Sequence, residues 1–162
     1  MKRIFHELPK IYSKESKVLI LGSFPSVKSR KVSYYYGNKM NRFWKVLSDI
    51  FKEEISDQND LRTEFILRHN LALWDVIESC EIVGSSDSSI NNVKVNDIKS
   101  ISTNSNLRLI VCNGNKAYDL YQKYVKDVDI PVVKLPSTSP ANAGWSLERL
   151  CEQYKVILDY IK

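Results

Sequence analysis

Four short runs of apolar residues alternate along this chain with segments of helical periodicity, and this order narrows the possible folds. Each run is bounded by Gly, Asn or Pro and has the length of a buried strand. Strands that alternate with helices form a parallel sheet covered on both faces. We therefore expect an α/β fold, with residues 1–162 in a single three-layer αβα domain. The expected strands span residues 17–21, 70–76, 108–112 and 131–135.

The segments between these runs place apolar residues three or four positions apart, which is the spacing of amphipathic helices. Asn41, Asn96 and Ser146 precede such segments and are candidate N-caps. The polar stretch at residues 84–92 predicts an exposed loop. The expected helices cover residues 42–52 and 60–68, a short segment through residue 101, residues 117–124, and a last segment through residue 161.

The composition is that of an ordinary globular domain. Hydrophobic residues make up 43% and charged residues 27% of the chain, and no apolar run approaches the length of a membrane span. Residues 1–10 lack the continuous apolar core of a signal peptide. We therefore expect a monomeric, cytoplasmic protein without membrane contact.

The cysteines and histidines predict neither a metal site nor a cofactor. Cys80, Cys112 and Cys151 form no Cys-x-x-Cys pair and are too few for a four-cysteine site, so buried reduced thiols are expected. His6 and His69 do not have a metal-ligand spacing. No glycine-rich phosphate loop of the nucleotide-binding kinds is present.

The positive charge is concentrated in one stretch. The net charge is +5, and residues 28–45 hold six cations and no acid, interleaved with tyrosine, phenylalanine and tryptophan. Cations with aromatics suit phosphate contact together with base stacking, although a solvated loop beside the core would give the same pattern. The six cations are Lys28, Arg30, Lys31, Lys39, Arg42 and Lys45.

Polar residues follow the expected strands at the ends that should share one edge of the sheet. We expect three polar segments to meet there, namely residues 22–26, 113–115 and 136–142. The Trp74-Asp75 pair should lie beside them. Open parallel sheets bind ligands beyond the carboxyl ends of their strands. No histidine lies at a strand end to serve Ser23, and GSFPS is not the G-x-S-x-G elbow of hydrolases. The edge instead offers groups that can hold a base without a metal.

Six segments together resemble the uracil-DNA glycosylase superfamily, and most of all its DNA-deoxyinosine (hypoxanthine-DNA) glycosylase branch. The similarity covers about residues 18–150. It implies a four-stranded parallel sheet, no cofactor, and hydrolysis of the N-glycosidic bond of a flipped deaminated base in double-stranded DNA, hypoxanthine above all, to leave an abasic site. The segments are GSFPS (22–26), YYYGNKMNRFWKVL (34–47), LALWDVIESCE (71–81), DSSI (87–90), CNGNKA (112–117) and LPSTSPANAGWS (135–146).

The resemblance also assigns the chemistry. GSFPS resembles the first superfamily motif, G-x-[DNE]-P-[GYS], in which many relatives carry at the third position an acid or amide that activates or positions water. Phe24 stands there and can only stack on the flipped base. The first catalytic candidate is therefore Asn41 in NRFW, which would position water or support the sugar. Ser23 is the second catalytic candidate. The alternative for Asn41 is a plain N-cap.

The remaining assignments concern base and DNA contacts. Asp75 matches the position where uracil-cleaving relatives carry an Asn that reads the base edge; its alternative is an Asp that binds loop amides. Asn113 would contact the base or only shape its turn, and Tyr36 would stack or form a pocket wall. Residues 137–141 match the second motif, which in relatives presses the minor groove, with Leu135 where some carry His. The expected DNA contacts are Ser26, Lys28, Arg42, Ser137, Thr138 and Ser139.

Three alternatives remain open at this point. The same fold could act on uracil, xanthine or a mismatched pyrimidine. A non-catalytic protein that binds damaged or single-stranded DNA would keep the pocket without base release. A nucleoside hydrolase would not need six cations in one stretch, and its substrate affinity would not fall steeply with salt as that of a duplex binder does.

Overall fold

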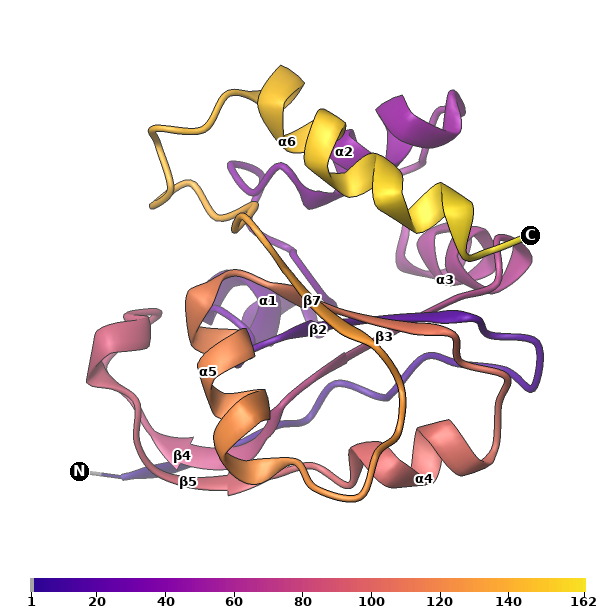
Figure 1. Cartoon of the computed structure of the whole chain (residues 1–162). Coiled ribbons are helices and arrows are strands. Elements are labelled where there is room, and N and C mark those ends of the chain that lie inside the picture. Colours follow the sequence, from indigo (N-terminus) through magenta and orange to yellow (C-terminus); the bar gives the residue numbers. More distant parts are fainter. Residues whose placement is uncertain (1) are drawn as a thin grey trace.

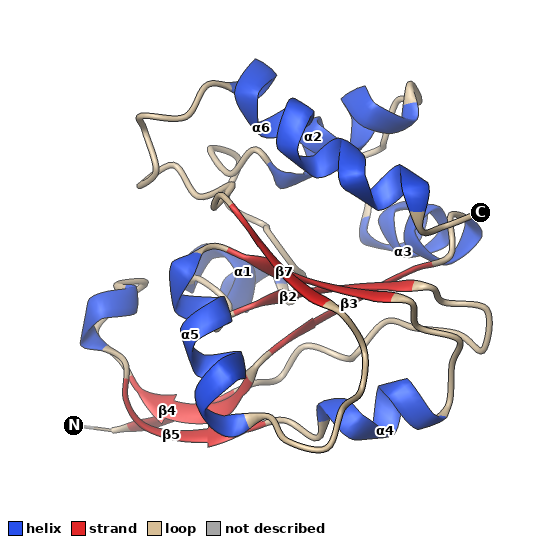
Figure 2. Ribbon diagram, in the orientation of Figure 1, coloured by secondary structure: helices blue, strands red, loops and turns tan. Residues whose placement is uncertain are grey.

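A four-stranded parallel sheet with helices on both faces forms the centre of the molecule, as the sequence predicted (Figures 1 and 2). The computed structural model describes residues 2–162. The strand order is β3-β2-β6-β7, and all neighbouring pairs are parallel. The strands are β2 (Val18–Gly22), β3 (Leu71–Asp75), β6 (Leu109–Asn113) and β7 (Val132–Leu135).

The apolar runs form strands because both of their faces are covered. In β2, Val18 and Ile20 belong to the core on one face of the sheet, whereas Leu19 and Leu21 belong to the core on the other. The helices α2 (Phe43–Phe51), α3 (Asn59–Arg68) and α6 (Leu147–Tyr154) cover the first face. The second face is covered by α4 (Ile98–Thr103) and α5 (Asn115–Tyr124).

A second, antiparallel sheet was not predicted. Its order is β1-β4-β5, with β1 (Arg3–Phe5), β4 (Ile77–Glu81) and β5 (Asn91–Val95). The chain passes from β3 into β4 through the single residue Val76. The segment after β1 runs along the edge of the main sheet, where the backbones of Ile11 and Leu73 exchange hydrogen bonds. The N-terminal segment is thereby held beside the carboxyl end of β3.

Several helix boundaries differ from the expectation. Arg42, not Asn41, stands at the N-cap position of α2, while the Asn41 side chain accepts the Phe43 N–H at 2.9 Å. Asp97, not Asn96, caps α4. Ser146 caps α6 as predicted, and a 3-10 helix (Lys155–Asp159) continues it.

Two stretches expected to be loops are partly ordered. The loop at residues 23–26 after β2, called the crest below, leads into α1 (Val27–Val32), a helix too short and too polar to show a clear periodicity. The stretch 84–92 contains a 3-10 turn (Asp87–Ser89) and the start of β5.

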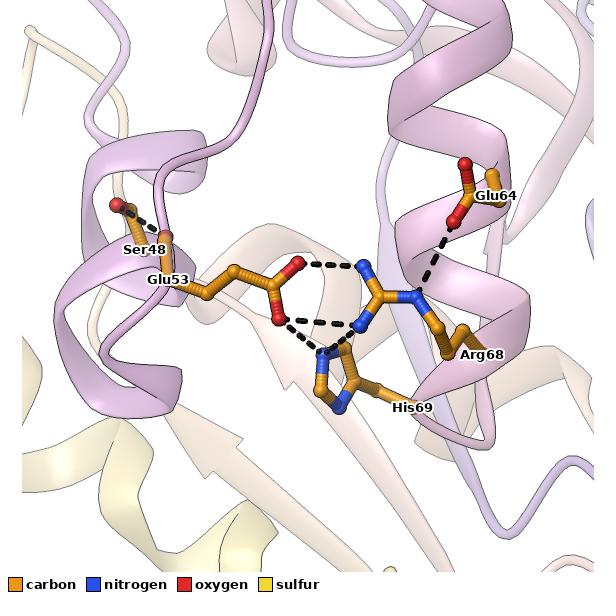
Figure 3. Close-up of polar contacts among 5 residues, drawn as sticks. All are labelled: Ser48, Glu53, Glu64, Arg68 and His69. Carbon is orange, nitrogen blue, oxygen red and sulfur yellow. Dashed lines mark hydrogen bonds and ion pairs between the residues drawn. The ribbon is translucent and has the colours of Figure 1, made fainter.

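An ionic cluster fastens the loop after α2 to the end of α3 (Figure 3). The Glu53 carboxylate accepts hydrogen bonds from both terminal nitrogens of Arg68, and His69 Nε2 lies 3.1 Å from Glu53 Oε1. Arg68 Nε also donates to Glu64, at 3.2 Å. Ser48 donates to the Glu53 carbonyl at 2.7 Å. The hydrogen bonds from Arg68 and then His69 lower the pKa of Glu53 from 4.5 to about 2.

This cluster predicts a pH-dependent contribution to stability. Because the pKa of Glu53 is lower in the folded protein, its contribution is complete above pH 4.5 and is lost as the pH falls through about 2. Glu53→Gln should lower the melting temperature at pH 7, and its difference from wild type should shrink between pH 4.5 and 2. Circular dichroism melts across this range measure the difference. The exposed neighbour Glu54 gives the control Glu54→Gln, and a Glu53→Gln difference that stays constant with pH would contradict the assignment.

Candidate active site

A cavity of about 270 Å³ lies at the carboxyl ends of β2, β3 and β6, and the loop after β7 and the segment before α2 complete its wall. Of the residues that the sequence singled out, ten line this cavity and two, Lys28 and Arg42, do not. The expected gathering of strand ends is therefore present. The ten are Ser23, Phe24, Ser26, Tyr36, Asn41, Asp75, Asn113, Ser137, Thr138 and Ser139.

Asp75 lies at the floor of the cavity and is 4% exposed. Its Oδ2 is 2.8 Å from Nε2 of His6, a side chain that is itself buried. Gly22 pairs with Asp75 across the strands, and a Cβ atom at Gly22 would lie only 2.5 Å from Asp75 Oδ1. The glycine therefore leaves room for the carboxylate, while the histidine fixes its orientation.

His6 is a site residue that the sequence did not reveal. It follows a strand of three mostly exposed residues, and its contact with Asp75 joins residues 69 positions apart. Its backbone N–H donates to the Glu78 carbonyl at 2.7 Å, so pairing of the N-terminal segment with β4 places it. No local periodicity marks such a residue.

Tyr36 presents its phenol to the same part of the cavity. Its ring stacks on Phe43 with centroids 3.9 Å apart, and its backbone has a left-handed φ of 52°, which is strained for a tyrosine. By distance and angle the buried hydroxyl has no hydrogen-bond partner within residues 2–162, although the Asn113 side chain lies near enough to oppose the rise of the Tyr36 pKa. Burial and the neighbouring Asp75 carboxylate raise the pKa of Tyr36 well above its usual value. The phenol is therefore a neutral donor available to a ligand.

Phe24 forms a wall of the cavity. It is 9% exposed, meets His6 edge to face, and carries the Arg30 guanidinium 5.6 Å from its ring centre. An aromatic wall beside a polar floor suits a flat heterocycle, because the ring can stack while the floor reads the edge.

A second carboxylate, Asp87, lies on this cavity's wall and was not among the expected site residues. Ser23 Oγ donates to Asp87 Oδ1 at 2.8 Å. Two further hydrogen bonds of 2.9 Å hold the loop that carries Asp87. The Val27 N–H donates to Ser85 Oγ, and the Arg30 guanidinium donates to the Gly84 carbonyl. The residue is exposed, but its carboxyl group faces the crest, where desolvation raises its pKa; Asp75 adds to this rise and Lys116 opposes it.

Asn41 sits in a loop built from two turns. Asn38 accepts the Met40 N–H through its side chain and the Asn41 N–H through its carbonyl, at 2.9 and 2.8 Å. Asn41 in turn accepts the Phe43 N–H through Oδ1. Both asparagines line the cavity. A hydrogen bond to the first residue of α2 and a place in the site therefore coexist at Asn41.

The loop after β7 is held from below by Asn113 and Arg42. Asn113 and Thr138 exchange two hydrogen bonds of 3.0 Å, and Thr138 is fully buried. The Arg42 guanidinium donates to the carbonyls of Ser139, Asn142 and Trp145. The structure thus shows Asn113, Thr138 and Arg42 supporting this loop, and the direct base or DNA contacts expected of them stay predictions.

The other expected DNA contacts lie nearer the surface. Lys28 is exposed on α1, and Ser26 caps that helix by accepting the Ser29 N–H. Ser137 and Ser139 accept backbone N–H groups of their own loop at 3.1 Å. Their roles toward DNA stay predictions.

The described side chains and helices meet the requirements of neither a metal site nor a membrane span. Within residues 2–162 no three His, Cys, Asp or Glu side chains come together as a metal-binding group. The three cysteines are buried and free. No helix in the described part of the chain combines the length and the apolar character of a membrane span.

The arrangement around Arg42 predicts that it stabilises a loop. Arg42→Gln removes its hydrogen bonds to three carbonyls and should lower the free energy of unfolding by about 2–3 kcal/mol, at roughly 1 kcal/mol for each bond. Limited proteolysis should then cut within residues 136–145 faster than in wild type. Lys28→Gln is the control, because it should weaken duplex binding at low salt and leave the loop unchanged. Weaker DNA binding by Arg42→Gln with normal stability and proteolysis would instead indicate a phosphate contact.

Comparison with known proteins identifies the family of this chain. The family model for the uracil DNA glycosylase superfamily matches residues 9–162. A protein named hypoxanthine DNA glycosylase from Methanosarcina acetivorans is 34% identical over 146 residues, which are 89% of this chain and 92% of that protein. One of the same name from Methanosarcina barkeri is 30% identical over 148 residues, or 85% and 93% of the two chains.

A solved structure agrees with these matches. It is the solution NMR structure of a Methanosarcina acetivorans protein described as a candidate uracil DNA glycosylase, and it superposes with a TM-score of 0.80 at 28% identity. The superposition covers 97% of this chain and 99% of the other. The chain belongs to the uracil DNA glycosylase superfamily.

Proposed function

We propose that this protein is a monofunctional DNA glycosylase that removes hypoxanthine from deoxyinosine in duplex DNA and leaves an abasic site. The observation that carries the proposal is the polar floor of the cavity, where the Asp75 carboxylate and the neutral Tyr36 phenol lie side by side near Gly22. Support also comes from two relatives, both named hypoxanthine DNA glycosylase, that match most of the chain.

The floor fits the edge that deamination creates. Hypoxanthine presents an N1–H donor and an O6 acceptor, whereas adenine presents an N1 acceptor and an N6 amino donor. Asp75 Oδ1, beside Gly22, would accept from N1–H, and the Tyr36 hydroxyl would donate to O6. Adenine N1 carries a lone pair and no hydrogen, so it would face the lone pair of a carboxylate oxygen and form no hydrogen bond with it. The site therefore discriminates against the undamaged base by leaving buried groups unpaired.

Entry to this floor requires the nucleotide to leave the duplex. The base must rotate out of the stack at a cost of a few kcal/mol, which is lowest for a mispaired base. Phe24 would stack on the extruded base, and Lys28 would bind backbone phosphate near the mouth. We further propose that the enzyme acts on DNA as a monomer.

Cleavage of the glycosidic bond passes through a sugar with oxocarbenium-like character. Asn41 lines the cavity together with Ser23 at the crest, where its amide would orient the water that attacks C1′. The amide does not accept the proton of that water. The floor meanwhile holds the leaving base through hydrogen bonds to its edge.

Two alternatives make different predictions. Uracil also presents an N–H donor beside a carbonyl acceptor, so the same floor would accept it, and the superfamily match is compatible with either base. A non-catalytic DNA reader would retain the floor but release no base.

The test is a base-release assay on duplexes that carry one inosine, uracil or xanthine, with alkali cleavage at the abasic site. Strongest cleavage at inosine supports the proposal. Preference for uracil would overturn the specificity and keep the enzyme class. Salt-sensitive duplex binding without cleavage of any of the three would favour the non-catalytic reader.

Asn41 gives a sharper prediction. Asn41→Ala should slow base release by about 100-fold or more while duplex affinity changes little, because one oriented polar group near the reacting atoms has this effect. The variant also loses the capping contact to Phe43, at about 1 kcal/mol of stability. Asn41→Ser keeps an oxygen acceptor for that contact. Activity restored in Asn41→Ser, together with restored stability, would show that Asn41 acts only as a cap.

A further inference from the structure

The cavity holds carboxylates at two depths. Asp75 is buried at the floor, whereas Asp87 is exposed at the wall nearest the solvent. A flipped nucleotide stays attached to the DNA outside the protein, so its base reaches the floor while its sugar stays at the mouth. In this arrangement Asp75 would meet the base edge, and Asp87 would lie on the side of the sugar.

The mouth needs a proton acceptor that the first motif does not supply. Phe24 stands at the position that carries an acid or amide in many relatives, and a phenyl ring cannot take a proton. The Asn41 amide can orient water but does not accept its proton. Among the residues that line the cavity, Asp75 and Asp87 are the two carboxylates, and Asp75 is committed to His6 and the floor.

The position of Asp87 suits this task. Ser23 Oγ donates to Oδ1 at 2.8 Å and fixes the carboxylate at the crest, next to the first motif. Within the described residues 2–162, its other oxygen has no hydrogen-bond partner and is available to a water molecule. The Val27–Ser85 and Arg30–Gly84 hydrogen bonds already hold the loop, so the Ser23–Asp87 contact is not the sole tie between loop and crest.

We propose that Asp87 is the catalytic base of the reaction and that Ser23 positions it; this inference rests on the proposed function. The C1′–N9 bond breaks, and its electron pair leaves with the hypoxanthine ring. The oxygen of water bonds to C1′, and one water proton passes to the Asp87 carboxylate. That proton then passes to the departing base or to solvent, which returns Asp87 to its ionised form. The negative charge of Asp87 also stabilises the positive charge that develops on the sugar.

The surroundings of Asp87 agree with such a role. Desolvation against the crest raises its pKa, and the Asp75 carboxylate adds to the rise. The Ser23 hydrogen bond and the Lys116 ammonium group of α5 act in the opposite direction. A carboxylate with a raised pKa is a stronger proton acceptor than an ordinary surface aspartate.

The experiment measures single-turnover base release with enzyme in excess over an inosine duplex, between pH 4 and 9. Asp87→Asn keeps an oxygen that can accept the Ser23 hydrogen bond but cannot take a proton. We expect its rate at pH 8 to fall by about 100-fold or more. We expect the wild-type rate to rise with pH at the acid end, and this rise should disappear in Asp87→Asn. Duplex affinity should be unchanged or higher, since one negative charge is lost.

Two further variants separate a chemical role from a structural one. Ser23→Ala removes a hydrogen bond that lowers the pKa of Asp87, so its acid limb should move to higher pH with a smaller loss of rate. Asp119→Asn, at an exposed position of α5, makes the same change in net charge and should keep the wild-type rate.

Each outcome decides the assignment. An Asp87→Asn rate within a few-fold of wild type overturns the proposal. So does a loss of rate that is accompanied by equal losses of duplex binding and melting temperature, with the acid limb retained, because that result describes a structural tie. If wild type releases no hypoxanthine, the proposed function fails and the inference fails with it. If wild type is active and Asp87→Asn is equally active, only the inference fails.

Discussion

The buried contact between His6 and Asp75 is the constraint around which the site is arranged. A carboxylate that is 4% exposed is costly unless it is paired, and His6 supplies the partner at 2.8 Å. The histidine reaches this place because the N-terminal segment pairs with β4 and then follows the edge of β3. Asn96 donates to the carbonyls of Asp75 and Ile77, which fixes the backbone where the chain leaves the main sheet. The second sheet is thus what holds the floor of the cavity.

Around that floor, the loops are held by side chains that do not face the ligand. Arg42 ties three carbonyls of the loop after β7, and Asn113 and Thr138 join this loop to the end of β6. Such ties keep the cavity formed before DNA arrives. Less of the binding free energy is then spent on ordering loops, and more remains to offset base flipping.

The sequence predicted what depends on local pattern and on the order of elements. The run at residues 17–21 became β2, the four strands are parallel, and the strand ends gather at one edge. Contacts between distant segments, such as that of His6 with Asp75, could not be predicted. Nor could a strand as polar as β5, whose sequence is NNVKV. Residue type alone also did not show that Arg42 and Thr138 hold a loop in place. A cation and a hydroxyl suit DNA, but whether their hydrogen-bonding groups are already used is a property of the fold.

Two carboxylates in one small cavity acquire different properties from their surroundings. Asp75 is buried, a histidine orients its carboxylate, and the absence of a side chain at Gly22 leaves room for it. The carboxylate can therefore read a base edge without moving. Asp87 is held at one oxygen by a serine, lies at the mouth, and faces Lys116. An acid at the mouth of a site that binds a polyanion weakens phosphate attraction. A catalytic role for Asp87 accounts for this acid in a chain of net charge +5. Its negative charge acts where the sugar becomes positive, and that attraction strengthens only as the glycosidic bond breaks.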